Sequence, residues 1–130
     1  MVILNIGLFS EILKINLIQK DQIIFLNVGQ GDSILLTSER AIGLIDLGPG
    51  NVVVERLNQY VPKATTNIEF VILTHFDKDH IEGFLRLSKL YFIKNLFISY
   101  SEKENSLISE IKDTILEKNI KTYYIDSIND

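Results

Sequence analysis

Strand-like patterns of apolar and polar residues occupy the first third of the chain. The two kinds of residue alternate over residues 13–17, which predicts a half-buried strand. Residues 23–28 form a short apolar run, which is typical of a strand buried on both faces. Residues 33–37 and 41–45 predict two more strands, joined by a hairpin at residues 38–40.

The rest of the chain alternates between helical and strand-like patterns. After a turn forced by residues 48–50, Asn51 can cap a helix that runs to about Tyr60. The remaining pattern predicts, in chain order, a strand at 68–73, a helix at 81–89, a strand at 96–99, a helix at 107–116 and a strand at 120–125. This order predicts an α/β (α+β) fold with a mixed β-sheet and helices on one face.

The N-terminal segment, residues 1–22, is set apart from a domain body at residues 23–130. Met1 to Phe9 is apolar apart from Asn5, but a membrane span needs about 20 apolar residues. The segment also lacks the basic start and cleavage site of a secretory signal. We expect an N-terminal strand or a frayed end, with the remnant of an anchor as the alternative.

Composition narrows the possible chemistry. The net charge is −4, with both signs interspersed, so no basic field can grip nucleic acid by charge alone. Nucleic acid bound through a metal stays open. The chain has no cysteine, which excludes disulfides and thiolate metal ligands.

Residues 74–80 carry the densest set of potential metal ligands. Both histidines of the protein, His75 and His80, lie here with Asp77 and Asp79 between them, after a predicted buried strand and before a helix. As bare carboxylates the two aspartates would repel each other at close range, and a divalent cation removes that repulsion. The alternative is a solvated loop in which Asp79 or His80 caps the next helix. Two residues of each type at this spacing favour the metal site.

Two other strand ends also carry polar groups. Residues 27–32 place two glycines and a carboxylate after a strand, where a tight turn is an equally good interpretation. Asp46 ends another predicted strand, where it could simply initiate a turn. Each signal alone is weak.

Together the three segments resemble one known family. FLNVGQGDS at residues 25–33, LIDLGPG at 44–50 and LTHFDKDHIEG at 73–83 are similar to the ComEC-type branch of the metallo-β-lactamase superfamily. That branch includes the extracytoplasmic domain of the DNA-uptake channel protein and many stand-alone relatives. The resemblance runs from about residue 23 to 125, and the order and spacing of three motifs make it specific.

The resemblance implies a role for each matching residue. His75 and Asp77 would belong to the first metal position, and Asp79 and His80 to the second, with Asp79 as the catalytic candidate. The remaining matches would lie around the metals: Asp46 steadying the loop below them, and Gly29, Gly31 and Asp32 shaping the rim. The oxygen-rich ligand set points to a divalent metal, zinc or manganese.

The sequence also departs from the family. The superfamily closes its two-metal site with two more histidines and a bridging aspartate from its second half, and no histidine follows His80. The resemblance therefore implies the N-terminal half of an αββα sandwich. It also implies at most one metal, held weakly, and a chain that is inactive alone.

These features leave three functional hypotheses. The complete protein would be a metal-dependent hydrolase of phosphodiesters, with nucleic acid as a possible partner and DNA as the expected substrate. Family members often work outside the cytoplasmic membrane, so an extracytoplasmic or membrane-associated location is an expectation too. The alternative is a non-catalytic metal-binding or interaction module that self-associates or pairs with a missing C-terminal half. A purely structural α/β domain with a charged loop is the third hypothesis.

Overall fold

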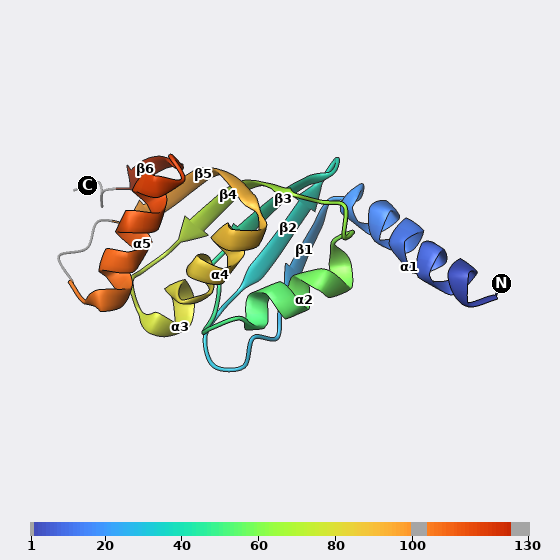
Figure 1. Cartoon of the computed structure of the whole chain (residues 1–130), viewed down its shortest axis with the longest axis horizontal. Coiled ribbons are helices and arrows are strands. Elements are labelled where there is room, and N and C mark those ends of the chain that lie inside the picture. The colour runs from blue at the N-terminus through green and yellow to red at the C-terminus, as the bar shows by residue number, and fades with distance from the viewer. Residues whose placement is uncertain (1, 100–103, 126–130) are drawn as a thin grey trace.

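Six strands form one mixed sheet in the order β1 to β6 (Figure 1). The structure is a computed structural model that describes residues 2–99 and 104–125. The first three strands pair antiparallel and the remaining pairings are parallel. The strands are β1 (Gln22–Phe25), β2 (Ile34–Ser38), β3 (Ala41–Ile45), β4 (Asn67–Leu73), β5 (Phe92–Ser99) and β6 (Lys121–Ile125).

The helices connect the parallel strands and lie along one side of the sheet (Figure 1). A separate N-terminal helix projects from the end of the sheet. The helices are α1 (Val2–Ile18), α2 (Val52–Tyr60), α3 (Lys78–Ile81), α4 (Gly83–Leu90) and α5 (Ser106–Glu117). Within residues 2–99 and 104–125, none of them has the length and apolar character to cross a membrane.

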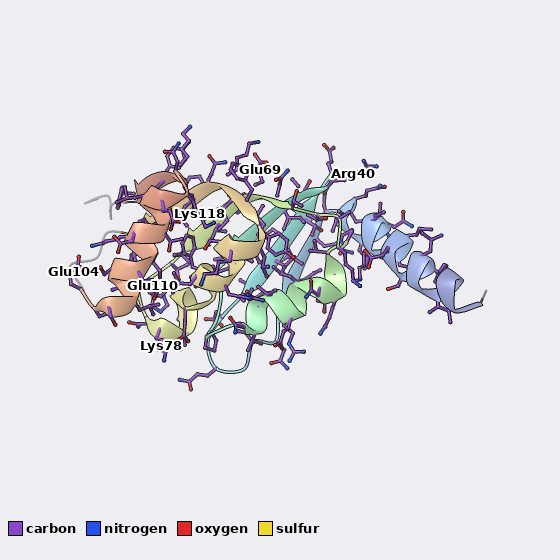
Figure 2. The ribbon with its side chains drawn as sticks, viewed as in Figure 1. Arg40, Glu69, Lys78, Glu104, Glu110 and Lys118 are labelled. Atoms are coloured by element: carbon purple, nitrogen blue, oxygen red, sulfur yellow. The ribbon has the colours of Figure 1, made fainter. Side chains whose placement is uncertain are left out.

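The core lies between the helices and the inner face of the sheet. Leu44, Val71 and Leu96 are fully buried on the three central strands and pair in register. Phe84 and Leu57 close the core from the helical side and are also fully buried. Charged side chains such as Arg40, Glu69 and Lys118 point outward into solvent (Figure 2).

The opposite, outer face of the sheet is apolar as well. One row of residues in register crosses all six strands: Phe25, Ile34, Ile45, Ile72, Phe97 and Tyr123. A second row on the same face contains Ile23, Leu36, Gly43 and Phe70, and it continues through Asn95 to Lys121. Most of these side chains are only partly buried, and Phe25 is 77% exposed. The described elements cover one face of the sheet and leave the other open.

The predicted fold class is confirmed, with a mixed sheet and helices on one face. The hairpin between β2 and β3 is confirmed too, and both of its turn residues, Glu39 and Arg40, have positive φ. This geometry matches the twist of the flanking strands. The helix predicted at 51–60 forms at Val52–Tyr60, although the Asn51 side chain makes no capping hydrogen bond.

Three predictions are wrong. Residues 13–17 belong to α1 and not to a strand, and the segment from residue 2 to 9 is helical too. A strand there would need a partner for its backbone groups, whereas a helix satisfies its own. The run at 23–28 is not buried on both faces, because β1 is an edge strand with an exposed Ile23. The single helix predicted at 81–89 is divided into α3 and α4 around Glu82.

Candidate metal centre

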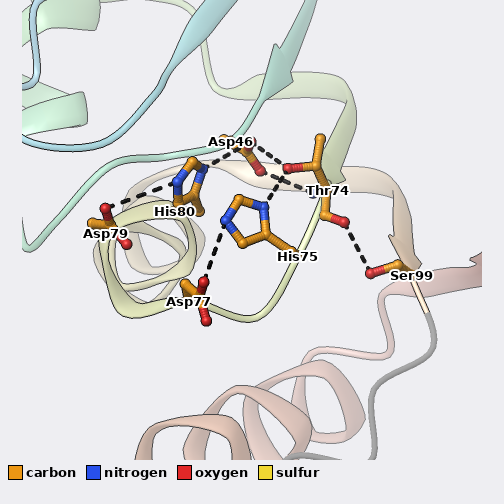
Figure 3. A network of polar contacts seen from close by, with 7 residues as sticks. All are labelled: Asp46, Thr74, His75, Asp77, Asp79, His80 and Ser99. Carbon is orange, nitrogen blue, oxygen red and sulfur yellow. Dashed lines mark hydrogen bonds and ion pairs between the residues drawn. The ribbon is translucent and has the colours of Figure 1, made fainter.

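The site lies where two parallel strands end side by side (Figure 3). Asp46 directly follows β3, and Thr74 and His75 directly follow β4. The carboxyl ends of parallel strands meet at one edge of a sheet, so the topology brings these residues together. His80 reaches the same point from the short helix α3.

Backbone hydrogen bonds tie the three motif segments to one another. Leu47 N donates to the His80 carbonyl over 2.8 Å, and Gly48 N donates to the Asp32 carbonyl over 3.0 Å. Gly83 N in turn donates to the Gly48 carbonyl over 3.1 Å. The loop after β3 is therefore the centre to which the other two loops are fixed.

The carboxylate of Asp46 organises the polar cluster. Its side chain is 6% exposed. Oδ1 accepts a hydrogen bond from Thr74 N at 2.9 Å, and Oδ2 accepts from Thr74 Oγ1 at 2.6 Å. Oδ2 also lies 3.0 Å from His80 Nδ1. These partners replace the water that the buried charge has lost.

The network determines which ring nitrogen of each histidine carries the proton. A carboxylate only accepts, so His80 Nδ1 must be the donor to Asp46. Thr74 Oγ1 donates its single hydrogen to Asp46, so it can only accept from His75 Nδ1, which lies 2.9 Å away. Both imidazoles are thereby held with Nδ1 protonated. In the neutral rings both Nε2 atoms keep a free lone pair.

Both Nε2 atoms face carboxylates (Figure 3). His75 Nε2 lies 3.6 Å from Asp77 Oδ2, and His80 Nε2 lies 3.9 Å from Asp79 Oδ2. The two rings are themselves close, with centroids 3.8 Å apart. Lone pairs and carboxylate oxygens that face one another repel, and a proton, a metal ion or a water molecule that donates to both removes this repulsion.

The donor set fits a divalent metal. One ligand atom each from Asp46, His75 and His80 falls within 4.8 Å of the others. Asp46 is already engaged on both oxygens, and a carboxylate that accepts from a ligating histidine orients that ligand. The structure therefore brings together one buried carboxylate and two imidazoles. Asp77 and Asp79 lie beside this cluster, with a carboxylate oxygen 3.6 Å from His75 Nε2 and 3.9 Å from His80 Nε2 respectively.

The predicted rim residues are placed in different ways. Gly31 has φ +100°, and a Cβ on it would lie 2.0 Å from the backbone oxygen of Asp79, so this glycine allows the rim loop to approach the metal loop. Gly29 also has positive φ, but a Cβ there would meet nothing within 4 Å. Asp32 contributes its backbone carbonyl, which accepts from Gly48.

Sequence reasoning gave no role to two residues that hold the site together. Thr74 links Asp46 to His75, yet it stands at a strand end where a threonine carries no special signal. Gly83 has an ordinary φ, but a Cβ on it would lie 2.3 Å from the Leu47 carbonyl oxygen. Only the three-dimensional packing shows why either residue is needed.

The chain was found to be similar to known proteins when structures were compared, and not when sequences were compared. No protein-family model and no curated protein sequence matches the chain. A peroxy diiron species of the chemotaxis sensor ODP is similar over 80% of this chain, with a TM-score of 0.53 and 20% identity. A new diphosphatase from the PhnP family is similar over 73%, with a TM-score of 0.45 and 18% identity. The chain spans 40% of the first protein and 36% of the second.

The likeness to the chemotaxis sensor shows a shared fold. The metallo-β-lactamase superfamily, its ComEC-type branch, the substrate and the roles of individual residues stay predictions.

We expect Thr74→Val to change which ring nitrogen of His75 carries the proton and to leave His80 unchanged. Valine keeps the shape of threonine but offers no acceptor to His75 Nδ1, while His80 keeps its bond to Asp46. Nitrogen-15 NMR of the metal-free protein, above the usual titration range of histidine, should show both rings protonated at Nδ1. In Thr74→Val only His75 should change, and Thr74→Ser should behave like the unsubstituted protein. An Nε2-protonated His75 in the unsubstituted protein would contradict the hydrogen-bond chain from His75 through Thr74 to Asp46.

Gly31→Ala and Gly29→Ala form a matched pair. Both place a side chain at positive φ, which costs about 1 kcal/mol of stability in each, but only the Gly31 variant pushes on Asp79. We expect Gly31→Ala to weaken zinc affinity by about 10–100-fold, as disturbed supporting groups typically do. Gly29→Ala should leave that affinity nearly unchanged. Equal losses in the two variants would show that the close approach to Asp79 is unimportant.

Proposed function

We propose that this chain is a metal-binding domain of the metallo-β-lactamase-like hydrolase type. The observation that carries the proposal is the buried Asp46 carboxylate, which aims two imidazole Nε2 atoms at two carboxylates. Neutral histidine nitrogens and carboxylate oxygens are suitable ligands for zinc, and the oxygen-rich set also suits manganese. A purely structural role for the loop would not explain why both rings are held with the same nitrogen outward.

Each residue has a distinct part in this proposal. His75 and His80 bind through Nε2, and Asp77 and Asp79 complete the ligand set. A bound cation would supply an activated water and would neutralise charge on a phosphoryl group. Asp79 is our catalytic candidate. Its side chain lies beside His80 and is 36% exposed, so it can accept a hydrogen bond from a water molecule in the adjoining solvent.

The proposed reaction of the complete protein is hydrolysis of a phosphodiester, with DNA as the substrate class. Support comes from the order of the three motifs, which resembles the ComEC-type branch, and from the suitability of metal sites for phosphoryl chemistry. The fold itself does not fix a substrate. The substrate therefore rests on the motif resemblance alone.

A second candidate, a metal-binding module without turnover, has its own supporting observation. The chain contains two histidines, and both are already in the cluster. Within residues 1–130, any further protein ligand must therefore be a group other than histidine. Two-metal hydrolysis requires ions about 3.5–4 Å apart, and the ligands on this one loop are too few to hold such a pair firmly.

We expect the metal-free chain to bind one zinc or manganese ion per chain in calorimetry. His75→Ala and His80→Ala should each reduce the affinity by at least about tenfold, because each removes a directly bound nitrogen. Asp113→Asn, which removes an exposed carboxylate from α5, is the matched control and should leave binding unchanged. Absence of binding heat with both metals, or equal losses in the control, would overturn the proposed centre.

We expect negligible phosphodiesterase activity from this chain alone, even with manganese or zinc supplied. The physical reason is the missing ligands, since each lost ligand or supporting group costs about 10–100-fold. Turnover of a nitrophenyl phosphodiester and of single-stranded DNA should match that of the His75→Ala, His80→Ala double variant. Activity well above this variant would favour the enzyme over the non-catalytic module, with carboxylates or a partner copy completing the site.

A further inference from the structure

The N-terminal helix α1 presents apolar side chains to solvent. It projects from the end of the sheet and joins the rest of the domain near its C-terminal end (Figure 1). Six of its apolar side chains are 40–64% exposed: Ile6, Leu8, Phe9, Ile12, Leu13 and Ile15. An isolated exposed apolar residue is ordinary on a protein surface, but six on one helix form a surface that water solvates poorly.

The charged side chains of α1 are engaged with each other and with the domain. The helix carries two of them, Glu11 and Lys14. Lys14 Nζ donates to Glu11 Oε1 over 3.0 Å, and Glu11 Oε2 accepts from the backbone nitrogen of Lys63 at 2.9 Å. These contacts, the one with Lys63 first, lower the pKa of Glu11, so its carboxylate stays charged at neutral pH. A surface helix normally turns its apolar side to the core and its charges to water, and in α1 this orientation is reversed.

The exposed apolar side of α1 is wide. At about 100° per residue, the six apolar residues spread over roughly half of the helix circumference. Among residues 6–18, Asn16 is the polar residue that falls within the same half. A seam that packs against a single partner helix is narrower, because it uses the a and d positions of each heptad. The width therefore favours an apolar medium that surrounds the helix over one partner helix.

Charge is distributed unevenly along the axis of α1. Residues 2–10 contain no charged residue, whereas Glu11, Lys14 and, just beyond the helix, Lys20 and Asp21 lie at the domain end. Residues 2–10 measure about 14 Å along the axis, close to half of the roughly 30 Å hydrocarbon core of a bilayer. This order matches one leaflet of a membrane, with hydrocarbon at the apolar end and head groups at the charged end. A protein partner would instead be recognised by a polar rim with hydrogen bonds.

We propose that the free end of α1 inserts into one leaflet of a lipid bilayer and holds the domain at the membrane surface. Ile6, Leu8 and Phe9 enter the hydrocarbon, where their transfer from water is favourable for the same reason as burial in a protein core. Lys14 and Lys20 lie at the level of the head groups, which long lysine side chains reach while their stems stay on apolar surface.

This membrane contact is separate from the candidate metal centre. The helix α1 joins the domain at the hairpin between β2 and β3, where Arg40 N donates to the Ile18 carbonyl over 2.9 Å. The metal centre lies at the other end of β3, where Asp46 follows the strand. A domain held through α1 therefore keeps the metal centre open to water, and lipid binding does not require a bound metal.

The test is binding of the full chain to lipid vesicles, with a chelator present so that the result does not depend on the metal centre. The vesicles consist of phosphatidylcholine alone or of equal parts phosphatidylcholine and phosphatidylglycerol. We expect the chain to float with both, because the contact is apolar. Phe9→Ser should weaken binding by about 10–100-fold. Phe92→Ser is the matched control, since Phe92 is 63% exposed, against 62% for Phe9, and lies on β5.

Tryptophan fluorescence shows which part of the chain enters the lipid. The chain has no tryptophan, so Phe9→Trp and Phe92→Trp each carry a single one. Vesicles should shift the emission of Phe9→Trp to shorter wavelength, and brominated lipids should quench it. The emission of Phe92→Trp should stay unchanged in both measurements.

The outcomes can be separated when circular dichroism shows that the variants stay folded. Flotation that is lost in Phe9→Ser and kept in Phe92→Ser, with a spectral shift at residue 9 alone, supports the proposal. A chain that binds neither kind of vesicle overturns it. Binding that survives Phe9→Ser also overturns it, because another surface must then contact the lipid. An oligomer that forms without lipid, is lost in Phe9→Ser and does not float would show that a second copy covers α1 instead.

Discussion

The buried carboxylate of Asp46 is the interaction on which the candidate site depends. A charge this deep is stable only when both oxygens find donors, and Thr74 and His80 supply them. The same bonds orient His80 directly and His75 through the Thr74 hydroxyl. Asp46 also has φ 53°, an unusual conformation that aspartate tolerates better than most residues. Requirements of backbone, charge and histidine orientation therefore coincide at one position.

The surrounding loops are held around Asp46 by close contacts between their backbones. Gly31 lets the first motif approach the carbonyl of Asp79, and Gly83 lets α4 begin against the carbonyl of Leu47. The Glu82 carboxylate accepts from Gly50 N at 2.9 Å and so joins the second motif to the third. Glycines in these motifs thus serve two purposes. Some allow positive φ, and others remove a side chain where two loops touch.

The sequence was most informative where a periodic pattern and a turn signal agreed. The hairpin of β2 and β3 and the helix α5 formed close to their predicted bounds. The alternation of apolar and polar residues gave a wrong prediction within α1, because five alternating residues cannot distinguish a strand from a helix that is apolar on several sides. The cluster of His75, Asp77, Asp79 and His80 could be proposed from spacing alone. The role of Thr74 could not, since it depends on the hydroxyl lying between two side chains from different segments.

The apolar runs in β4 and β5 include residues on the face of the sheet that the helices do not cover. In β4, Val71 and Leu73 face the helices while Phe70 and Ile72 face outward. A strand with only one covered face would alternate apolar with polar residues, as antiparallel sheets open to water do. In β4 these outward positions are aromatic and aliphatic, which favours a second covered face, whereas in β5 the outward Phe97 stands between Asn95 and Ser99. The sequence of β4 therefore favours an additional layer, independently of whether the metal centre is complete.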